Sequence, residues 1–259
     1  MNIYVVPRGR RKITVLIMVL VFLLLGFGYM LGNRHRTTEE AEPVSRVLPI
    51  YGTDNEDMRI SLTINCAWGA ADIPDFLTVL KQYNVRATFF VVGTWAEKYP
   101  EMVQMIYDAG HEIGNHSYSH RLPSQSTTEQ LEQEIKRCNE IVEQITGEKP
   151  VLYRAPSGDY TEEVVQLAGR LGMAAIKWTA DSVDWKKDVS KKDLINRILN
   201  RTQSGGILLF HNDTQYTLAA LPEILEQLSA RGFCFVPVSE LIYPDNFEIN
   251  AQGIQVKKH

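Results

Sequence analysis

Short apolar runs alternate with segments of helical periodicity over most of the chain. Runs that predict buried strands lie at 60–64, 86–92, 151–153, 174–178, 206–210 and 233–236. Between them, apolar residues recur three and four positions apart, which is typical of helices that bury one face. The clearest helix signals are a capping box formed by Thr127 and Gln130 and a stop at Gly147. Strands that alternate with helices indicate an α/β domain with a parallel sheet.

The beginning of the chain has a different pattern. Residues 13–31 carry no charge and are apolar apart from Gly, Thr and Tyr, which is nearly enough to span a bilayer core of about 30 Å. Basic residues precede the run, and no small-residue cleavage site follows it. The pattern predicts an uncleaved transmembrane anchor with the rest of the protein outside the cytoplasm. The expected organisation is a cytoplasmic segment (1–12), an anchor (13–31), a linker (32–58), one α/β domain (59–243) and a polar tail (244–259).

Composition and charge narrow the possibilities. A chain of 259 residues with 44% hydrophobic residues is long enough for a barrel or a large open sheet. A formal net charge of −4 gives no reason to expect a nucleic-acid partner. No Gly-x-Gly-x-x-Gly follows the first strand, so a (β/α) barrel is favoured over a dinucleotide-binding fold. The cysteines, at positions 66, 138 and 234, are odd in number and do not form a disulfide framework.

Half of the six histidines lie between Gly110 and His120. Imidazole is the commonest protein ligand for zinc, and His116 and His120 are four positions apart. We expect both in a loop at the end of a strand. A polar loop with hydrogen-bonded imidazoles is the alternative interpretation of the same spacing.

Other chemically capable residues also follow predicted strands, and the active sites of barrels lie at the carboxyl ends of the strands. Their shared location predicts an enzyme-like site. These residues are Asn65, Cys66, His116, His120, Arg154, Asp181, Asp184 and His211.

The segments 87–93 and 110–120, with Pro100 between them, resemble the polysaccharide deacetylases, which are NodB-like carbohydrate esterases of family 4. The resemblance implies a distorted (β/α) barrel with seven strands. It also implies that His116 and His120 hold a divalent metal, usually Zn²⁺.

Three further segments resemble motifs of the same family. In 154–158, the resemblance implies that Arg154 orients the catalytic carboxylate and that the Ser157 N–H helps to bind the oxyanion. In 181–185, it implies that Asp181 orients the acid histidine and that Trp185 lines the sugar groove. In 209–211, it implies that His211 protonates the leaving amine. Asp184 and Leu209 are expected among the substrate-binding residues.

The first motif departs from the family. The family has Thr-Phe-Asp-Asp-Gly, whereas residues 63–69 read Thr-Ile-Asn-Cys-Ala-Trp-Gly. Asn65 replaces the general base, and Cys66 replaces the third metal ligand. A thiolate can bind zinc, although Cys66 could equally be a small buried residue at a strand end. The Ala-Trp-Gly ending is similar to that of a sporulation-associated, membrane-anchored subgroup.

The resemblance therefore implies metal-dependent removal of the acetyl group from N-acetylglucosamine in cell-wall glycan, with peptidoglycan as the expected substrate. Activation of water would fall to the metal or to another carboxylate such as Asp213. Two alternatives stay open because of Asn65: a domain that binds glycan without hydrolysing it, and a membrane-tethered partner in wall or spore assembly. Trp68, Trp95 and Trp185 would stack on sugars in the enzyme and in the binding module.

Overall fold

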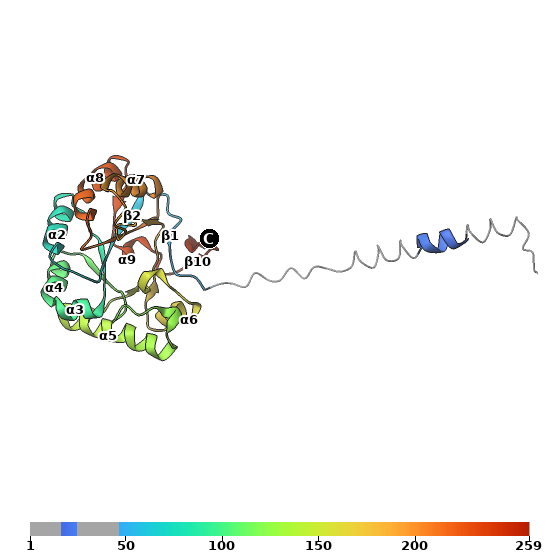
Figure 1. Ribbon diagram of the computed structural model, residues 1–259, viewed down its shortest axis with the longest axis horizontal. Coiled ribbons are helices and arrows are strands. Elements are labelled where there is room, and N and C mark those ends of the chain that lie inside the picture. Colours follow the sequence, from blue (N-terminus) through green and yellow to red (C-terminus); the bar gives the residue numbers. More distant parts are fainter. Residues whose placement is uncertain (1–16, 25–46, 259) are drawn as a thin grey trace, which may run out of the picture. The chain divides into compact units, whose positions relative to one another are not determined.

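The computed structural model describes residues 17–24 and 47–258. The chain divides into two units, 1–45 and 46–259, which are treated separately (Figure 1). Residues 17–24 are helical. Within the described ranges, no helix is both long enough and apolar enough to cross a membrane. The segment 1–12 and the rest of the expected anchor (13–31) lie outside the described residues.

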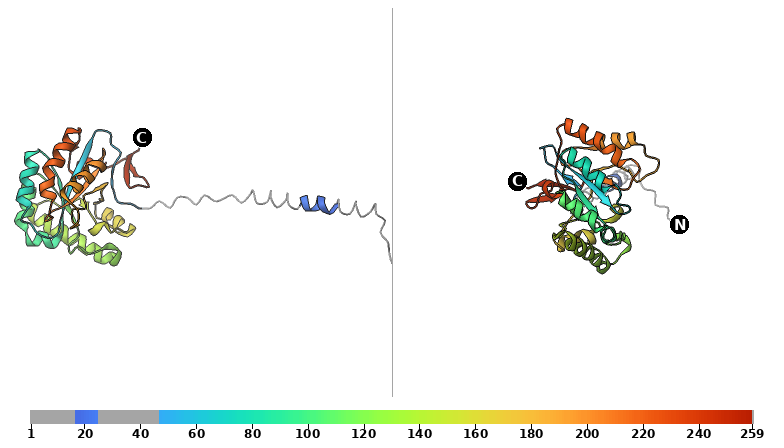
Figure 2. Two further views of the ribbon diagram at one scale, coloured as in Figure 1. Left: turned by 45° about the horizontal axis from the view of Figure 1, so that its top comes forward. Right: turned by 90° about the vertical axis from the view of Figure 1, so that its left-hand side faces the viewer.

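The second unit is built on a curled, fully parallel sheet in which β2 (Arg59–Cys66) is central (Figure 2). Along the sheet the strand order is β6-β5-β4-β3-β2-β8-β7, and β9 pairs with the start of β2. The sheet is therefore a half-barrel rather than a closed barrel. The other strands are β3 (Thr88–Val91), β4 (Glu112–Asn115), β5 (Leu152–Tyr153), β6 (Ala174–Ala175), β7 (Ala180–Asp181), β8 (Ile207–His211) and β9 (Cys234–Phe235).

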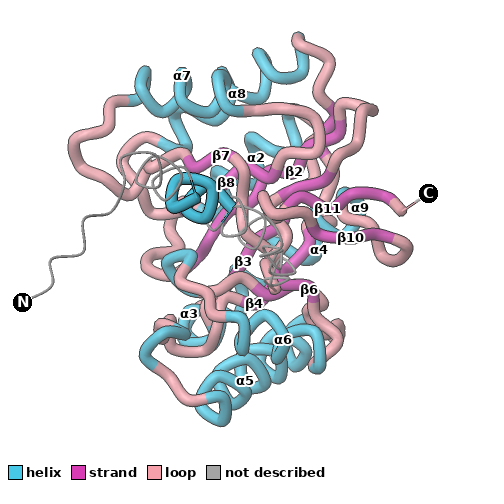
Figure 3. The backbone as a smooth tube through the Cα atoms, turned by 90° about the vertical axis from the view of Figure 1, so that its right-hand side faces the viewer, coloured by secondary structure: helices cyan, strands magenta, loops and turns pink. Residues whose placement is uncertain are grey.

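Helices connect the strands, as the periodicity predicts. Figure 3 shows α7 and α8 beside the β7 end of the sheet and α5 and α6 beside the β6 end. The predicted capping box of Thr127 and Gln130 is formed at the start of α5, and Gly147 ends that helix with φ 78°. The helices are α2 (Ile73–Gln82), α3 (Gly93–Lys98), α4 (Pro100–Asp108), α5 (Thr128–Thr146), α6 (Glu162–Arg170), α7 (Lys191–Arg201), α8 (Thr217–Ala230) and α9 (Val238–Leu241).

The pleat of β2 separates the core from the site. Ile64 and Cys66 belong to the main hydrophobic core. Thr63 and Asn65 both accept hydrogen bonds from Arg154 instead. Successive side chains of a strand point to opposite faces, so one strand supplies the apolar core and the polar floor of the site.

The end of the chain differs from the expectation of an irregular tail. β10 (Phe247–Ile249) and β11 (Ile254–Lys257) form a small sheet with β1 (Gly52–Thr53), which lies inside the expected linker. The polar Gln255 is fully buried there and bonds to both the N–H and the carbonyl of Tyr243. A buried amide with satisfied hydrogen bonds explains why apolar patterning does not reveal this strand.

Candidate functional site

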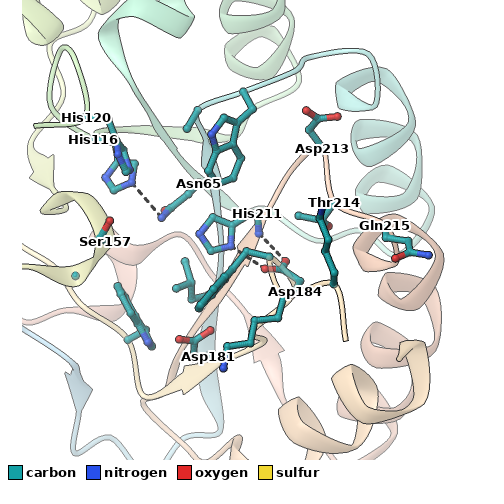
Figure 4. A pocket seen from close by; sticks show the side chains of 18 residues that line it. Asn65, His116, His120, Ser157, Asp181, Asp184, His211, Asp213, Thr214 and Gln215 are labelled. Atoms are coloured by element: carbon teal, nitrogen blue, oxygen red, sulfur yellow. Dashed lines mark hydrogen bonds and ion pairs between the residues drawn. The ribbon is translucent and has the colours of Figure 1, made fainter. Parts of the chain in front are cut away.

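A pocket of about 890 Å³ lies at the carboxyl ends of the parallel strands. Most of the residues singled out in the sequence meet there (Figure 4). Arg154 lies beneath the pocket floor, fully buried behind Asn65. The predicted site residues that line the pocket are Asn65, Trp68, His116, His120, Ser157, Asp181, Asp184, Trp185, Leu209, His211 and Asp213.

The two predicted metal-binding histidines lie close together. His116 follows β4 directly, and the centroids of its ring and the His120 ring are 5.1 Å apart. Burial, together with the proximity of His120, lowers the pKa of His116 well below its usual value. Burial and the proximity of His211 also lower the pKa of His120. Both imidazoles are therefore neutral at pH 7, the form in which histidine binds metals.

Glu134 on α5 fixes the loop between these histidines, a role that sequence reasoning missed. Its carboxylate accepts hydrogen bonds from Ser117 Oγ at 2.6 Å and from the N–H and Oγ of Ser119 at 2.7 Å each. Glu134 stands three residues after the inward-facing Leu131. A carboxylate next to the apolar face of the predicted helix was the feature of the sequence that could have indicated this role.

Asn65 bridges the floor of the pocket. Its Oδ1 accepts from Arg154 Nη1 at 3.0 Å, and its Nδ2 lies 3.2 Å from His116 Nε2. His116 Nδ1 lies 2.8 Å from the carbonyl of Arg154, so this nitrogen carries the proton and Nε2 is the acceptor. Every polar atom of the Asn65 amide thus has a suitable partner. The lone pair that His116 would offer a metal already accepts the Asn65 N–H.

Arg154 is buried, and among residues 17–24 and 47–258 no carboxylate forms an ion pair with it. Its guanidinium donates to Thr63 Oγ1 at 2.8 Å and to the Lys177 carbonyl at 3.1 Å, and it lies 3.9 Å above the Phe90 ring. Burial lowers the pKa of Arg154 to about 9. The arginine keeps the position implied by the family motif, but Asn65 gives it a neutral partner.

The predicted role of Cys66 as a metal ligand is wrong for this structure. Its thiol is fully buried in the main hydrophobic core and does not line the pocket. Because Asn65 faces Arg154, the pleat turns the next side chain of β2 away from the histidines. Burial, and then the nearby Asp72, raises the pKa of the Cys66 thiol well above its usual value, so the thiolate that zinc requires is disfavoured.

The residues present do not fit the catalytic metal that the family implies. A catalytic zinc site needs three protein ligands. Over residues 17–24 and 47–258, no group of three or more His, Cys, Asp or Glu side chains is arranged to hold a metal ion. Asp213 does not complete the set, because its carboxylate accepts from Gly69 N–H and lies across the pocket from His116 in Figure 4.

The predicted partner of His211 also needs correction. Asp184, rather than Asp181, accepts from His211 Nδ1 at 2.7 Å and from its backbone N–H at 2.8 Å. Thr217 Oγ1 donates to the same carboxylate at 2.7 Å. Asp181 instead accepts from the N–H of Val183, whose left-handed φ of 56° lies within the turn that brings Asp184 inward.

The three tryptophans expected to stack on sugars differ in position. Trp68 and Trp185 line the pocket and are 53% and 55% exposed, and the Trp68 ring lies 5.9 Å from that of His211. Trp95 is 2% exposed, and its Nε1 donates to the Gly69 carbonyl at 2.8 Å. The expectation that Trp95 stacks on sugars is therefore wrong, because its ring is in the core. Trp95 instead supports the loop that carries Trp68.

The chain is similar in sequence to known proteins. The polysaccharide deacetylase family model matches residues 52–176. The chain is 33% identical over 209 residues to a peptidoglycan-N-acetylglucosamine deacetylase of Bacillus cereus. The alignment covers 79% of this chain and 96% of that protein. It is 33% identical over 194 residues to the uncharacterised protein YlxY of Bacillus subtilis, covering 75% of this chain but only 60% of YlxY.

A solved structure is also similar. BA3943 of Bacillus anthracis, described as a CE4 family pseudoenzyme, superposes with a TM-score of 0.73 at 30% identity, covering 82% of this chain and 73% of BA3943. A mutant of BA3943 is described as having restored enzymatic activity. This chain therefore belongs to the polysaccharide deacetylase (NodB-like, carbohydrate esterase 4) family, whose active members are hydrolases that act on N-acetyl groups.

Proposed function

We propose that this protein binds N-acetylated cell-wall glycan, with peptidoglycan as the main candidate, and that its hydrolytic step is strongly impaired. The observation that carries the proposal is the position of Asn65, whose amide joins Arg154 to His116 Nε2. The similarity to BA3943, itself described as a pseudoenzyme, supports the same conclusion.

The pocket keeps the features that binding needs. Its volume of about 890 Å³ is at the upper end of the usual range for ligand sites. The exposed faces of Trp68 and Trp185 offer apolar platforms for sugar rings. His211 and the Ser157 backbone lie at the same pocket and can contact the acetamide group.

Over the described part of the chain, the site lacks two features that hydrolysis requires, a general base and a complete set of metal ligands. A neutral carboxamide does not take a proton from water, and loss of a general base typically lowers a rate about 10²- to 10⁴-fold. Members of this family are generally metal-dependent, and a bound metal would supply Lewis-acid activation. Cys66 is directed into the core, and the His116 Nε2 lone pair already accepts a hydrogen bond from Asn65 Nδ2.

We further propose that the protein acts at the outer face of the cell membrane, with an association with sporulation. The uncharged residues 13–31 and their basic flanks support an anchor. The Ala-Trp-Gly ending of the first motif supports the sporulation-associated subgroup.

A metal-dependent deacetylase is the second candidate, because the His211–Asp184 pair remains formed and could protonate a leaving amine. The deciding experiment measures binding of N-acetylglucosamine oligomers by the full chain. Acetate release from those oligomers and from peptidoglycan is followed in parallel, with zinc and with a chelator.

Binding without acetate release is the expected result. Release that depends on zinc would instead establish the hydrolase. Absence of both, in a folded sample, would refute glycan recognition and favour a role as an assembly partner.

A further inference from the structure

Lys177 contacts two parts of the site, one through its backbone carbonyl and the other through its side-chain ammonium group. Its backbone carbonyl accepts from Arg154 Nη2 at 3.1 Å, and its Nζ donates to the Gly158 carbonyl at 3.0 Å. The backbone N–H of Lys177 donates to the Ile50 carbonyl at 2.7 Å, which fixes this residue between β6 and β7. Lys177 therefore touches both the buried guanidinium and the turn that contains Ser157.

The Lys177 ammonium is surrounded by aromatic rings. Nζ lies 4.9 Å from the Trp178 centroid, 5.3 Å from that of Tyr160 and 5.4 Å from that of Tyr51. Burial lowers the pKa of Lys177. In the described part of the chain, no carboxylate lies within ion-pair distance of this nitrogen. The cation is thus held by ring faces and directed at one carbonyl.

The carbonyl that Lys177 holds belongs to a turn in an uncommon conformation. Ser157 and Gly158 have φ values of 55° and 66°. The left-handed region is unfavourable for serine, so the surroundings must impose it. The packing is tight, since a Cβ on Gly158 would lie 2.6 Å from the Trp178 ring and 3.1 Å from Lys177 Nζ. Lys177 and Trp178 together form the support beneath this turn.

We propose that Lys177 is a positioning residue that fixes the Ser157 turn, and that it thereby gives the pocket its preference for N-acetylated sugars over sugars with a free amine. This inference rests on the proposed function, in which the Ser157 N–H meets the acetamide carbonyl. The Lys177 side chain is not expected to touch the sugar, since it lies behind the turn and does not line the pocket.

The test uses the full chain with Lys177→Met, which keeps an unbranched apolar stem among the rings but removes the donor. Lys192→Met on the exposed side of α7 is the matched control. The first readout is amide hydrogen exchange at Gly158 and Asp159, whose N–H groups bond to the Ala155 and Pro156 carbonyls within the turn. Loss of a charged donor should make their exchange about tenfold faster.

The second readout is the ratio of the dissociation constants for an N-acetylglucosamine tetramer and for the glucosamine tetramer. Lys177→Met should reduce this preference at least about threefold, while Lys192→Met leaves both readouts unchanged. Equal weakening for the two tetramers would mean a merely structural role and would overturn the proposal.

Unchanged exchange would show that Lys177 does not hold the turn. Faster exchange with an unchanged preference would overturn the role in selectivity. If the wild type binds neither tetramer, the proposed function and the selectivity both fail. The exchange rates still decide whether Lys177 fixes the turn.

Discussion

Replacing Asn65 with aspartate tests the hydrogen-bond network at the floor of the pocket. The new carboxylate would still accept from Arg154 Nη1, now 3.0 Å from the Asn65 Oδ1 position. At a charge separation of about 4 Å and an effective dielectric constant of about 20, the attraction is about 4 kcal/mol. Desolvation of the carboxylate opposes this gain with several kcal/mol. The contact with Arg154 alone should therefore change the free energy of unfolding by close to zero.

The effect of Asn65→Asp should depend on pH because of His116. His116 Nδ1 still donates a hydrogen bond to the Arg154 carbonyl, so the new carboxylate faces the unprotonated Nε2. The hydrogen bond from the Asn65 side-chain amide to Nε2 is lost. If Nε2 takes up a proton, it donates to the carboxylate in a bond worth about 1.5–3 kcal/mol, against about 1 kcal/mol for the neutral bond in the wild type. The substitution therefore raises the pKa of His116 in the folded state.

Relative to the wild type, a higher folded-state pKa of His116 adds stability at low pH, and this added stability is lost as pH rises through the new pKa. We expect Asn65→Asp, relative to the wild type, to be about 2 kcal/mol more stabilising at pH 5.5 than at pH 8. Thermal unfolding should register this as about 4–8 °C. Asn200→Asp on the exposed side of α7 is the control for added charge. A difference from wild type that is the same at both pH values would refute the contact between Asn65 and His116.

Other parts of the structure give three further predictions. Trp68→Ala and Trp185→Ala should each weaken binding of N-acetylglucosamine oligomers about tenfold, because each removes an exposed ring; titration calorimetry measures this, and unchanged affinity in both would contradict sugar stacking. Glu134→Gln should destabilise the fold by about 2 kcal/mol in urea unfolding, and a loss below about 0.5 kcal/mol would mean that its bonds to the histidine loop contribute little. Burial lowers the pKa of His111 to about 4, and its Nδ1 accepts from Ala87 N–H. As pH falls, His111 is therefore protonated in the unfolded chain before it is protonated in the folded protein. The free energy of unfolding should fall by up to about 3 kcal/mol as pH drops from 6.5 through 4. His111→Gln should flatten that fall, and an unchanged pH profile would contradict the assignment.

The architecture could be predicted from local patterns because parallel strands place their carboxyl ends at one edge. Apolar runs located β2, β3, β5, β6, β8 and β9, but not β4 or β7. The polar residues that follow the strands meet in one pocket. The small sheet of β1, β10 and β11 could not be predicted, since its pairing joins residues from the two ends of the domain. A polar strand with a buried, fully bonded Gln255 has no distinctive apolar pattern.

The roles within the site depend on side-chain direction, which spacing alone does not determine. Both faces of β2 are buried, so burial could not tell whether Asn65 or Cys66 points at the histidines. The choice between Asp181 and Asp184 depends on the turn at Val183, whose positive φ is unusual for a β-branched residue. Glu134 and Lys177 act through contacts with loops distant in sequence, and neither lies in a motif.

The network around Asn65 separates binding from hydrolysis in physical terms. The resemblance to the family implies a carboxylate beside Arg154 and a metal on His116, whereas Asn65 is a neutral partner of Arg154 and donates to the His116 Nε2 lone pair. The same amide nevertheless holds both side chains in place, because its oxygen accepts from the guanidinium and its nitrogen donates to the imidazole. Trp68 and Trp185 line the same pocket, and the Ser157 turn is joined to Arg154 indirectly, through Lys177. Under the proposed function, a change from carboxylate to carboxamide at position 65 therefore removes the proton acceptor and occupies the His116 lone pair, while Trp68 and Trp185 still line the pocket.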